Sequence, residues 1–217
     1  MGLHIQVENL NLSFHWNKFS RIIFQNLNLD IEQGSFVSVI GGNGSGKSSL
    51  LKLILGLASP DTGTISISGN PVQPGFPQSI KSNHVSYLAQ QIEDLFFADT
   101  VKEELLYDQI ADQKDAQEIL LALGVNSLLD RVLDSLSGGE RQALALAQFA
   151  VQESTLLILD EPSSYLDQAR ASWLKTYLEQ ALSRGKTILH VTQYPAEIKW
   201  GTHVIDLDDI NPNVVQV

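Results

Sequence analysis

The sequence predicts an α/β protein in which helices flank a mostly parallel sheet and one helical segment is inserted. Apolar, strand-like runs alternate with helical runs in the outer parts of the chain, and this order produces parallel sheets. A glycine-rich loop at residues 41–48 joins one of these strands to a helix. The pattern is helical from about residue 92 to residue 150, so this stretch is expected to form an inserted subdomain.

The first 90 residues are expected to hold mainly strands. Alternation of apolar and polar residues, which indicates a strand with one buried face, occurs at Leu3–Val7, Leu27–Ile31 and Thr64–Ser68. Short apolar runs predict two more strands, Phe36–Ile40 and Val85–Leu88. An almost continuous apolar surface predicts a buried helix at Lys47–Leu57. Prolines and a glycine predict a loop over 70–79.

The later part of the chain is expected to alternate helix and strand. Apolar residues recur at helical spacing in 100–124, where Gly124 indicates a helix C-terminus. Further helices are predicted at Gly139–Val151 and at Gln168–Arg184. The remaining strands are predicted at Leu156–Leu159, Thr187–Val191 and His203–Leu207.

Composition narrows the function classes. The chain has 217 residues, enough for one large domain with a sizeable core. Its formal net charge of −11 argues against nucleic acid as a partner, because contact with a phosphate backbone needs clustered Lys and Arg. The absence of cysteine excludes disulfides and agrees with a cytoplasmic location. The longest apolar run, Leu50–Ala58, is too short to span a membrane, so any membrane link is expected to come through a partner.

Residues 41–49 form the first candidate site. The run reads Gly41, Gly42, Asn43, Gly44, Ser45, Gly46, Lys47, Ser48 and Ser49. Its Gly-x4-Gly-Lys-Ser spacing, between a strand and a helix, matches a phosphate-binding loop of the Walker A type. Backbone N–H groups and the helix N-terminus would bind phosphate, Lys47 would reach the β- and γ-phosphates, and Ser48 would ligate Mg²⁺. The competing interpretation is a plain helix cap, which needs neither Lys47 nor Ser48.

Two carboxylates follow the predicted strand Leu156–Leu159. In open parallel sheets, ligands bind beyond the carboxyl ends of the strands, so Asp160 and Glu161 are expected beside the phosphate loop. Asp160 would orient Mg²⁺ through water, and Glu161 would polarise the attacking water as a general base. The competing interpretation is a solvated strand end.

A second glycine motif precedes the predicted helix that ends at Val151. The run Ser137, Gly138, Gly139, Glu140 contains a capping box, which by itself explains a helix start. Capping does not require two glycines, however, and bare backbone at a helix N-terminus is another anion site. The run is therefore a candidate for a second contact with phosphate.

The three motifs in this order resemble the ATP-binding cassette (ABC) ATPases, the motors of ABC transporters, over about residues 3–207. The resemblance implies one ABC ATPase domain of P-loop NTPase fold over 1–217, with an N-terminal antiparallel β portion. A nucleotide-binding α/β core would comprise 1–91 and 151–217, and the helical subdomain with the signature motif about 92–150. ATP and Mg²⁺ are the implied cofactors.

The resemblance also implies partners. Ser137, Gly138 and Gly139 would contact the γ-phosphate of ATP held by a second ABC ATPase subunit, identical or related, in a head-to-tail dimer. Separate transmembrane transporter subunits would hold this dimer on the cytoplasmic face of the cell membrane.

Three weaker motifs match the family by position. Gln90 lies where the family places a glutamine that senses Mg²⁺ and water, with Gln91 as the alternative. Trp16 matches the aromatic residue that stacks on adenine, although a Trp near a strand end also commonly packs. Residues 163–167 resemble the loop that joins the two sites, with Tyr165 in place of a small residue.

The chain departs from the family at Gln193. A histidine that touches the γ-phosphate is usual there. A glutamine amide can still donate a hydrogen bond but cannot become cationic, so the charge-assisted bond is lost. His190 lies inside the preceding strand and is expected to be a packed strand histidine instead of a replacement. A reduced or partner-dependent hydrolysis rate follows as a hypothesis.

Residues 90–104 resemble the corresponding stretch of energy-coupling-factor and cobalt-type importer ATPases, without the proline that those carry before Glu93. This resemblance implies import of a vitamin or a metal ion. The alternative is a non-transport ABC ATPase, such as an iron–sulfur-assembly ATPase acting with soluble partners. A small-molecule P-loop kinase would have no use for the second glycine motif.

Overall fold

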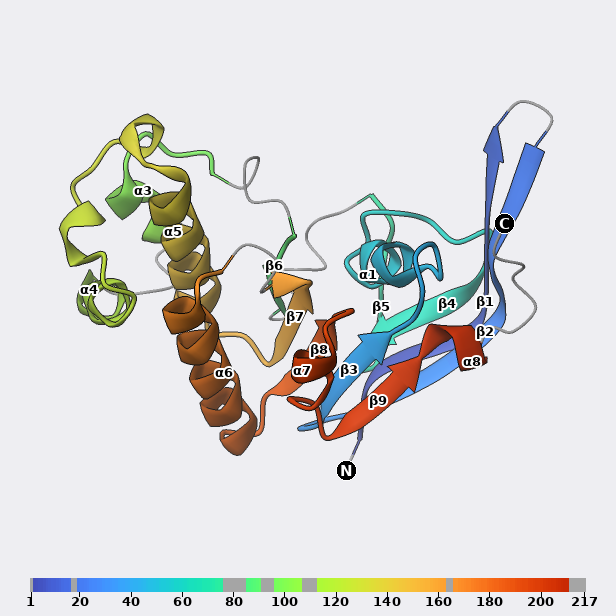
Figure 1. Ribbon diagram of the computed structural model, residues 1–217. Helices are drawn as coiled ribbons and strands as arrows, with labels where there is room; N and C mark the ends of the chain where they lie inside the picture. The colour runs from blue at the N-terminus through green and yellow to red at the C-terminus, as the bar shows by residue number, and fades with distance from the viewer. Residues whose placement is uncertain are drawn as a thin grey trace.

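Two β-sheets organise the protein. The computed structural model describes residues 2–16, 19–75, 85–90, 96–106, 113–162 and 166–210 (Figure 1). The first sheet is antiparallel with strand order β2-β1-β4-β5; its strands are β1 (Leu3–Trp16), β2 (Phe19–Glu32), β4 (Thr62–Ile67) and β5 (Asn70–Pro71). The predicted antiparallel portion near the N-terminus is therefore confirmed.

The second sheet is parallel throughout, with strand order β6-β7-β8-β3-β9. Its strands are β3 (Phe36–Ile40), β6 (Val85–Leu88), β7 (Leu156–Asp160), β8 (Thr187–Val191) and β9 (His203–Asp206). The carboxyl ends of parallel strands lie along one edge of a sheet, so the segments that follow β3, β7 and β8 are brought together there.

The helices lie on both sides of the parallel sheet. Between the two sheets lies α1 (Lys47–Ile54), whereas α5 (Gly138–Val151) and α6 (Gln168–Ser183) lie on the opposite side (Figure 1). Two shorter helices, α3 (Val101–Leu105) and α4 (Gln113–Ala122), pack beside α5. Single turns, α7 (Pro195–Ile198) and α8 (Leu207–Ile210), follow β8 and β9.

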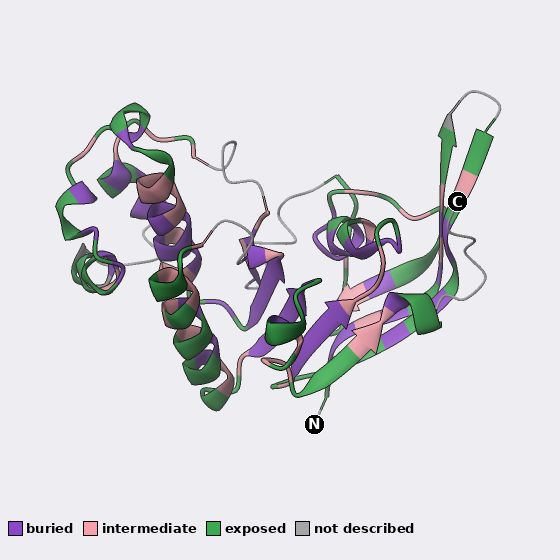
Figure 2. Cartoon of the chain, in the orientation of Figure 1, coloured by how far each residue is buried: buried purple, intermediate pink, exposed green. Residues whose placement is uncertain are grey.

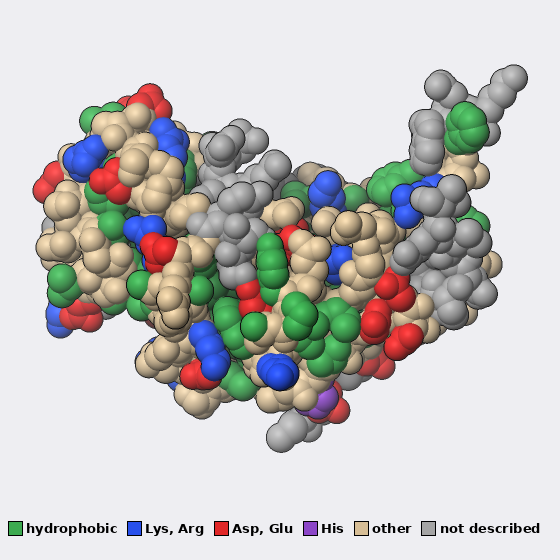
Figure 3. All heavy atoms as spheres, viewed as in Figure 1, with side chains coloured by type: hydrophobic (Ala, Val, Ile, Leu, Met, Phe, Trp, Pro, Cys, Tyr) green, Lys and Arg blue, Asp and Glu red, His purple; other side chains and the backbone are tan. Residues whose placement is uncertain are grey.

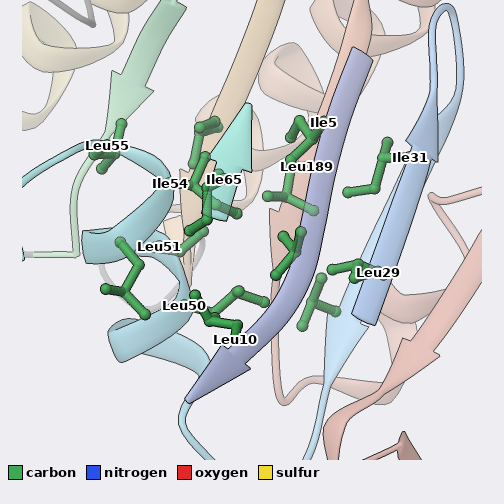
Figure 4. Close-up of a cluster of buried hydrophobic side chains, with 14 of the residues drawn as sticks. Ile5, Leu10, Leu29, Ile31, Leu50, Leu51, Ile54, Leu55, Ile65 and Leu189 are labelled. Atoms are coloured by element: carbon green, nitrogen blue, oxygen red, sulfur yellow. The ribbon is translucent and has the colours of Figure 1, made fainter. Parts of the chain in front are cut away.

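Alternate side chains of the parallel strands enter two separate cores. On β7, Leu156 and Ile158 belong to the core shared with α1 and the antiparallel sheet, part of which Figure 4 shows. Leu157 and Leu159 belong to the core shared with the helices on the other side. The central strands are thus buried on both faces, as Figure 2 shows, which explains why they are continuous apolar runs.

Several element bounds agree with the sequence-based expectations. β3, β6 and β8 have the predicted bounds, and α5 and α6 differ from theirs by one residue at one end. The predicted lengths of β1 and β2 were wrong, because each strand has 14 residues. Their pairing contains register shifts, and Asn9 and Asn26 have positive φ, so simple alternation breaks down along them.

The predicted helix over 100–124 consists of α3 and α4 in the described residues. Gly124 has φ 74°, as expected for a residue that ends a helix. In Figure 1, α3, α4 and α5 stand away from the antiparallel sheet, on the far side of the parallel sheet. The division into a core at 1–91 and 151–217 and a helical subdomain at about 92–150 stays a prediction.

Candidate functional site

The glycine-rich loop connects β3 to α1 at the carboxyl edge of the parallel sheet. Gly46 immediately precedes α1 with φ 101°, and a Cβ atom there would lie 2.7 Å from Cζ of Phe24. Only glycine fits this position without displacing the aromatic ring. Lys47 is buried, and its Nζ donates to the carbonyl oxygens of Gly41 and Gly42 at 2.7 and 3.0 Å. The loop therefore curls around the lysine ammonium.

Two charged side chains hold the loop from outside, and sequence reasoning missed both. The Gly42 amide donates to Oδ2 of Asp208 at 2.7 Å, and Nη2 of Arg21 donates to the Gly44 carbonyl at 3.1 Å. Figure 3 shows acidic side chains gathered over α8, where Asp208 lies. Asp208 follows β9, so the rule that sites gather beyond the carboxyl ends of parallel strands could have pointed to it. Nothing in the sequence relates Arg21 to the loop.

The loop suits a phosphate group. The buried Ser45 hydroxyl has no hydrogen-bond partner among the described residues, which is costly for a buried polar group unless a ligand completes it. The N-terminus of α1 adds positive potential. Ser48 is exposed at the start of α1, with Ser49 beside it half-buried, so the Ser48 hydroxyl is open to a ligand.

Asp160 ends β7 and is 7 % exposed. Burial, and next the charge of Glu161, raise the pKa of Asp160 to about 6, although Lys47 and Lys52 act in the opposite direction. Carboxylate and hydroxyl oxygens are ligands that Mg²⁺ prefers. Asp160 and Ser48 therefore carry oxygens of the kind that Mg²⁺ would need, and phosphate oxygens and water would fill the remaining positions.

Asp160 should destabilise the nucleotide-free protein at neutral pH. Its pKa is higher in the folded chain than the usual value of 3.8, so the free energy of unfolding falls as pH rises from about 4 to 6 and stays low above that. A shift of about two units corresponds to roughly 3 kcal/mol. Relative to the parent, Asp160→Asn should therefore gain up to about 3 kcal/mol between pH 4 and pH 8 in urea unfolding. The same change at exposed Asp130 is the control, and an equal gain there would contradict the assignment.

Glu161 is held in an unusual backbone conformation directly after Asp160. Its φ is 46°, and its amide donates to the carbonyl of Val191 at 2.9 Å. Non-glycine residues with positive φ are uncommon, and the surrounding structure must hold them there. The bond to Val191, at the end of β8, fixes the direction in which the Glu161 side chain leaves the strand.

Two glutamine amides meet on the Glu161 carboxylate. Nε2 of Gln90, after β6, and Nε2 of Gln193, after β8, each donate to Glu161 Oε2 at 3.1 Å. The three residues follow three neighbouring strands of one parallel sheet, which explains how positions so distant in sequence converge. The structure thus brings two predicted catalytic side chains, Gln90 and Gln193, to one carboxylate oxygen of the third, Glu161.

The second glycine motif starts α5. Ser137 and Glu140 form the predicted capping box: Ser137 N and Oγ donate to Glu140 Oε2 at 2.8 and 2.7 Å, and Glu140 N donates to Ser137 Oγ at 3.4 Å. The two hydrogen bonds that Ser137 donates, with a smaller contribution from Arg131, lower the pKa of the Glu140 carboxyl. Ser137 and Gly138 are exposed, and no atom lies within 4 Å of a Cβ built on Gly138. The start of α5 therefore presents open backbone.

This motif does not face the chain's own phosphate loop. Figure 1 places the start of α5 among the helices on one side of the parallel sheet, and α1 on the other. A phosphate bound at the start of α5 would therefore belong to another molecule.

Several predicted positions lie outside the described residues. Gln91 and residues 163–165 are among them, and the side chain of Trp16 is not described, although its backbone pairs with Phe19 at the end of β1. Asp167, which follows residues 163–165, caps α6 by accepting from the Arg170 amide at 2.8 Å. Its other oxygen pairs with the Arg170 guanidinium at 3.1 Å.

His190 is fully buried in β8, as predicted for a packed strand histidine. Its ring stacks on Trp200 with centroids 5.4 Å apart. It therefore does not occupy the position of Gln193, which is exposed beyond the end of the strand.

The fold and this site define a nucleotide-binding protein of the P-loop class. The family model described as ABC transporter matches residues 24–164, and the chain therefore belongs to the ABC transporter family, as one of its ATPases. ATP is the nucleotide that this family binds.

Similar proteins include transporter subunits. An energy-coupling factor transporter ATP-binding protein, EcfA1 of Fusobacterium nucleatum subsp. nucleatum, is 32% identical over 94% of this chain and 79% of its own length. The molybdate import ATP-binding protein MolC of Haemophilus influenzae is 32% identical over 91% of this chain and 76% of its own. A dimeric structure of the ATP-binding cassette MJ0796 with ADP and Pi has a TM-score of 0.80, 24% identity and 93% coverage of both chains, a likeness of fold.

None of the helices in the described part of the chain combines the length and the apolar character that crossing a bilayer requires.

Proposed function

We propose that the protein binds and hydrolyses ATP as one half of a head-to-tail dimer, and that dimer closure drives import through separate membrane subunits. The observation that carries this proposal is the exposed start of α5. Ser137 and Gly138 are exposed on the opposite side of the parallel sheet from the chain's own phosphate loop. A second subunit, turned head to tail, would supply the phosphate that this motif lacks.

Each side chain of the site has a role in this proposal. Residues 41–49 bind the phosphates, with Lys47 as the cation and Trp16 stacking on adenine. Glu161 accepts a proton from the attacking water. Gln90 and Gln193 orient this carboxylate through their bonds to Oε2. Ser48, Gln90 and Asp160 would hold Mg²⁺, which would supply charge stabilisation to the phosphates.

The proposed cargo is a vitamin or a metal ion. The relatives named for energy-coupling factor transport and molybdate import support an importer. The chain would then bind membrane subunits on the cytoplasmic face of the membrane and would act as a peripheral subunit.

Co-purification tests the transport role. The tagged protein, expressed in its native host and isolated from detergent-solubilised membranes, should carry integral membrane proteins at a constant ratio. Mass spectrometry identifies them, and the ATPase rate should change when they are present. Recovery with soluble assembly proteins alone, and none from the membrane, would contradict transport and support the iron–sulfur-assembly alternative.

Gln193→His should raise the ATPase rate by about tenfold, equivalent to roughly 1.4 kcal/mol in the barrier. An imidazole at this position can keep a hydrogen bond to Glu161 and can also become cationic beside the γ-phosphate. The measurement is steady-state turnover of the parent and the variant, each alone and with the membrane subunits. Equal rates in all four mixtures would show that Gln193 is a neutral substitution.

A further inference from the structure

A buried polar cluster lies next to Gln193, where β8 leads into α7. It consists of His190 in β8, Thr192 just after this strand, and Glu197 in α7. These three side chains are 0 %, 0 % and 5 % exposed. No step of the proposed ATPase mechanism uses any of them, yet burying a carboxylate and an imidazole is costly unless their neighbours compensate.

Thr192 links the cluster to the turn that carries Gln193. Its hydroxyl donates to Glu197 Oε2 at 2.8 Å and accepts from the amide of Tyr194 at 3.1 Å. The Glu197 amide in turn donates to the Tyr194 carbonyl at 2.9 Å. Thr192, on one side of Gln193, is therefore tied directly to the Glu197 carboxylate, and Tyr194, on the other side, is tied to it through the Thr192 hydroxyl.

His190 provides the other contact to this carboxylate. Its Nε2 lies 3.2 Å from Glu197 Oε2, although the two groups lack the alignment of a hydrogen bond. Trp200 stacks on the ring, and Phe36 meets it edge-on with centroids 6.2 Å apart. The imidazole is thus held between two aromatic rings, and its position limits where Glu197 can lie.

Gln193, which lies between Thr192 and Tyr194 in this turn, reaches the Glu161 carboxylate. Gln193 is exposed, yet its side-chain Nε2 donates to Glu161 Oε2 at 3.1 Å. An exposed glutamine side chain has several rotatable bonds, so its contact depends on where its backbone lies. The buried cluster supplies that backbone restraint.

We propose that Glu197 is a positioning residue for ATP hydrolysis: with Thr192 as the link and His190 as its buried partner, it fixes the turn from which Gln193 reaches Glu161. This inference rests on the proposed role of Gln193. It assigns to Glu197 no contact with ATP and none with water.

A double-mutant cycle in the full chain separates positioning from general support of the fold. The variants are Glu197→Ala, Gln193→Ala and the two combined, with kcat and KM for ATP measured at steady state. Each single change should lower kcat by about tenfold, as a misplaced catalytic contact does, while KM stays within about twofold because the phosphate loop is untouched. The double variant should be no slower than Gln193→Ala, because both changes remove the same contact.

Conservative variants and a control sharpen the test. Glu197→Gln keeps an oxygen that can accept from Thr192, so its kcat should lie between those of the parent and Glu197→Ala. Exposed Lys199, which directly follows α7, serves as the control, and Lys199→Ala should have the parent's kcat. If Glu197→Ala does not fold, Thr192→Val enters the same cycle with the same expectation.

Three results would overturn the inference, and they are distinguishable. Losses that multiply, so that the double variant is about a hundredfold slower, would mean that Glu197 acts independently of Gln193. Parent-like kcat in Glu197→Ala would equally exclude positioning. If Gln193→Ala itself keeps the parent's kcat, the role proposed for Gln193 fails and this inference fails with it.

Discussion

Glu161→Gln should bind ATP with the affinity of the parent but hydrolyse it about 10²- to 10⁴-fold more slowly, the usual contribution of a general base. A glutamine keeps the length of the side chain and an oxygen that Gln90 and Gln193 can still contact, but it cannot take a proton from water. Affinity is measured by calorimetry and turnover by phosphate release. The variant should therefore keep ATP binding and lose only the hydrolysis step.

Glu153→Gln is the matched control for this variant. Glu153 is exposed and precedes β7, whereas Glu161 follows the same strand. The control should have the parent's rate. Parent-like turnover of Glu161→Gln would exclude Glu161 as the base, and a loss of ATP affinity in this variant would instead indicate that the carboxylate helps to hold the nucleotide.

Gly138→Asp should abolish ATP-driven dimerisation and turnover while ATP binding to the monomer survives. The new carboxylate would face the γ-phosphate of the partner's nucleotide, and like charges that are removed from water repel strongly. The fold should tolerate the change: a Cβ at Gly138 meets no atom within 4 Å, and an acidic residue in the first turn of α5 suits the helix dipole. Calorimetry and light scattering measure binding and assembly separately.

Gly138→Asn has the same shape without the charge and should lose less activity. A folded Gly138→Asp protein that still dimerises with ATP would restrict the motif to its capping role. Loss of nucleotide binding by the monomer would contradict the proposal in another way, because the phosphate loop of the same chain is unchanged in this variant.

The sequence was most informative where both faces of a strand are buried. The apolar runs at Phe36–Ile40, Val85–Leu88 and Thr187–Val191 are strands with those bounds, because each enters both cores or their borders. The outer halves of β1 and β2 were not predicted. Asn9 and Asn26, which have positive φ, interrupt the alternation between these halves and the runs that were predicted.

The site shows the same division between local and long-range information. The spacing of the phosphate loop predicted that a glycine precedes α1 and that the loop surrounds the lysine. Both features are local requirements of a strand–loop–helix unit. The shared contact of Gln90 and Gln193 with Glu161 was not predictable from spacing, because it depends on the order of β6, β7 and β8 in the sheet. The hydrogen bond from the Gly42 amide to Asp208 depends likewise on β9 lying beside β3.

The molecular mass of Glu161→Gln in solution, with and without Mg²⁺ and ATP, tests the central proposal most directly. Light scattering coupled to size-exclusion chromatography should give a monomer without nucleotide and twice that mass with ATP, because slow hydrolysis lets the closed dimer accumulate. The same protein with Gly138→Asp added should stay monomeric in ATP. A Glu161→Gln protein that binds ATP and remains a monomer, alone and with its membrane subunits, would contradict the head-to-tail dimer.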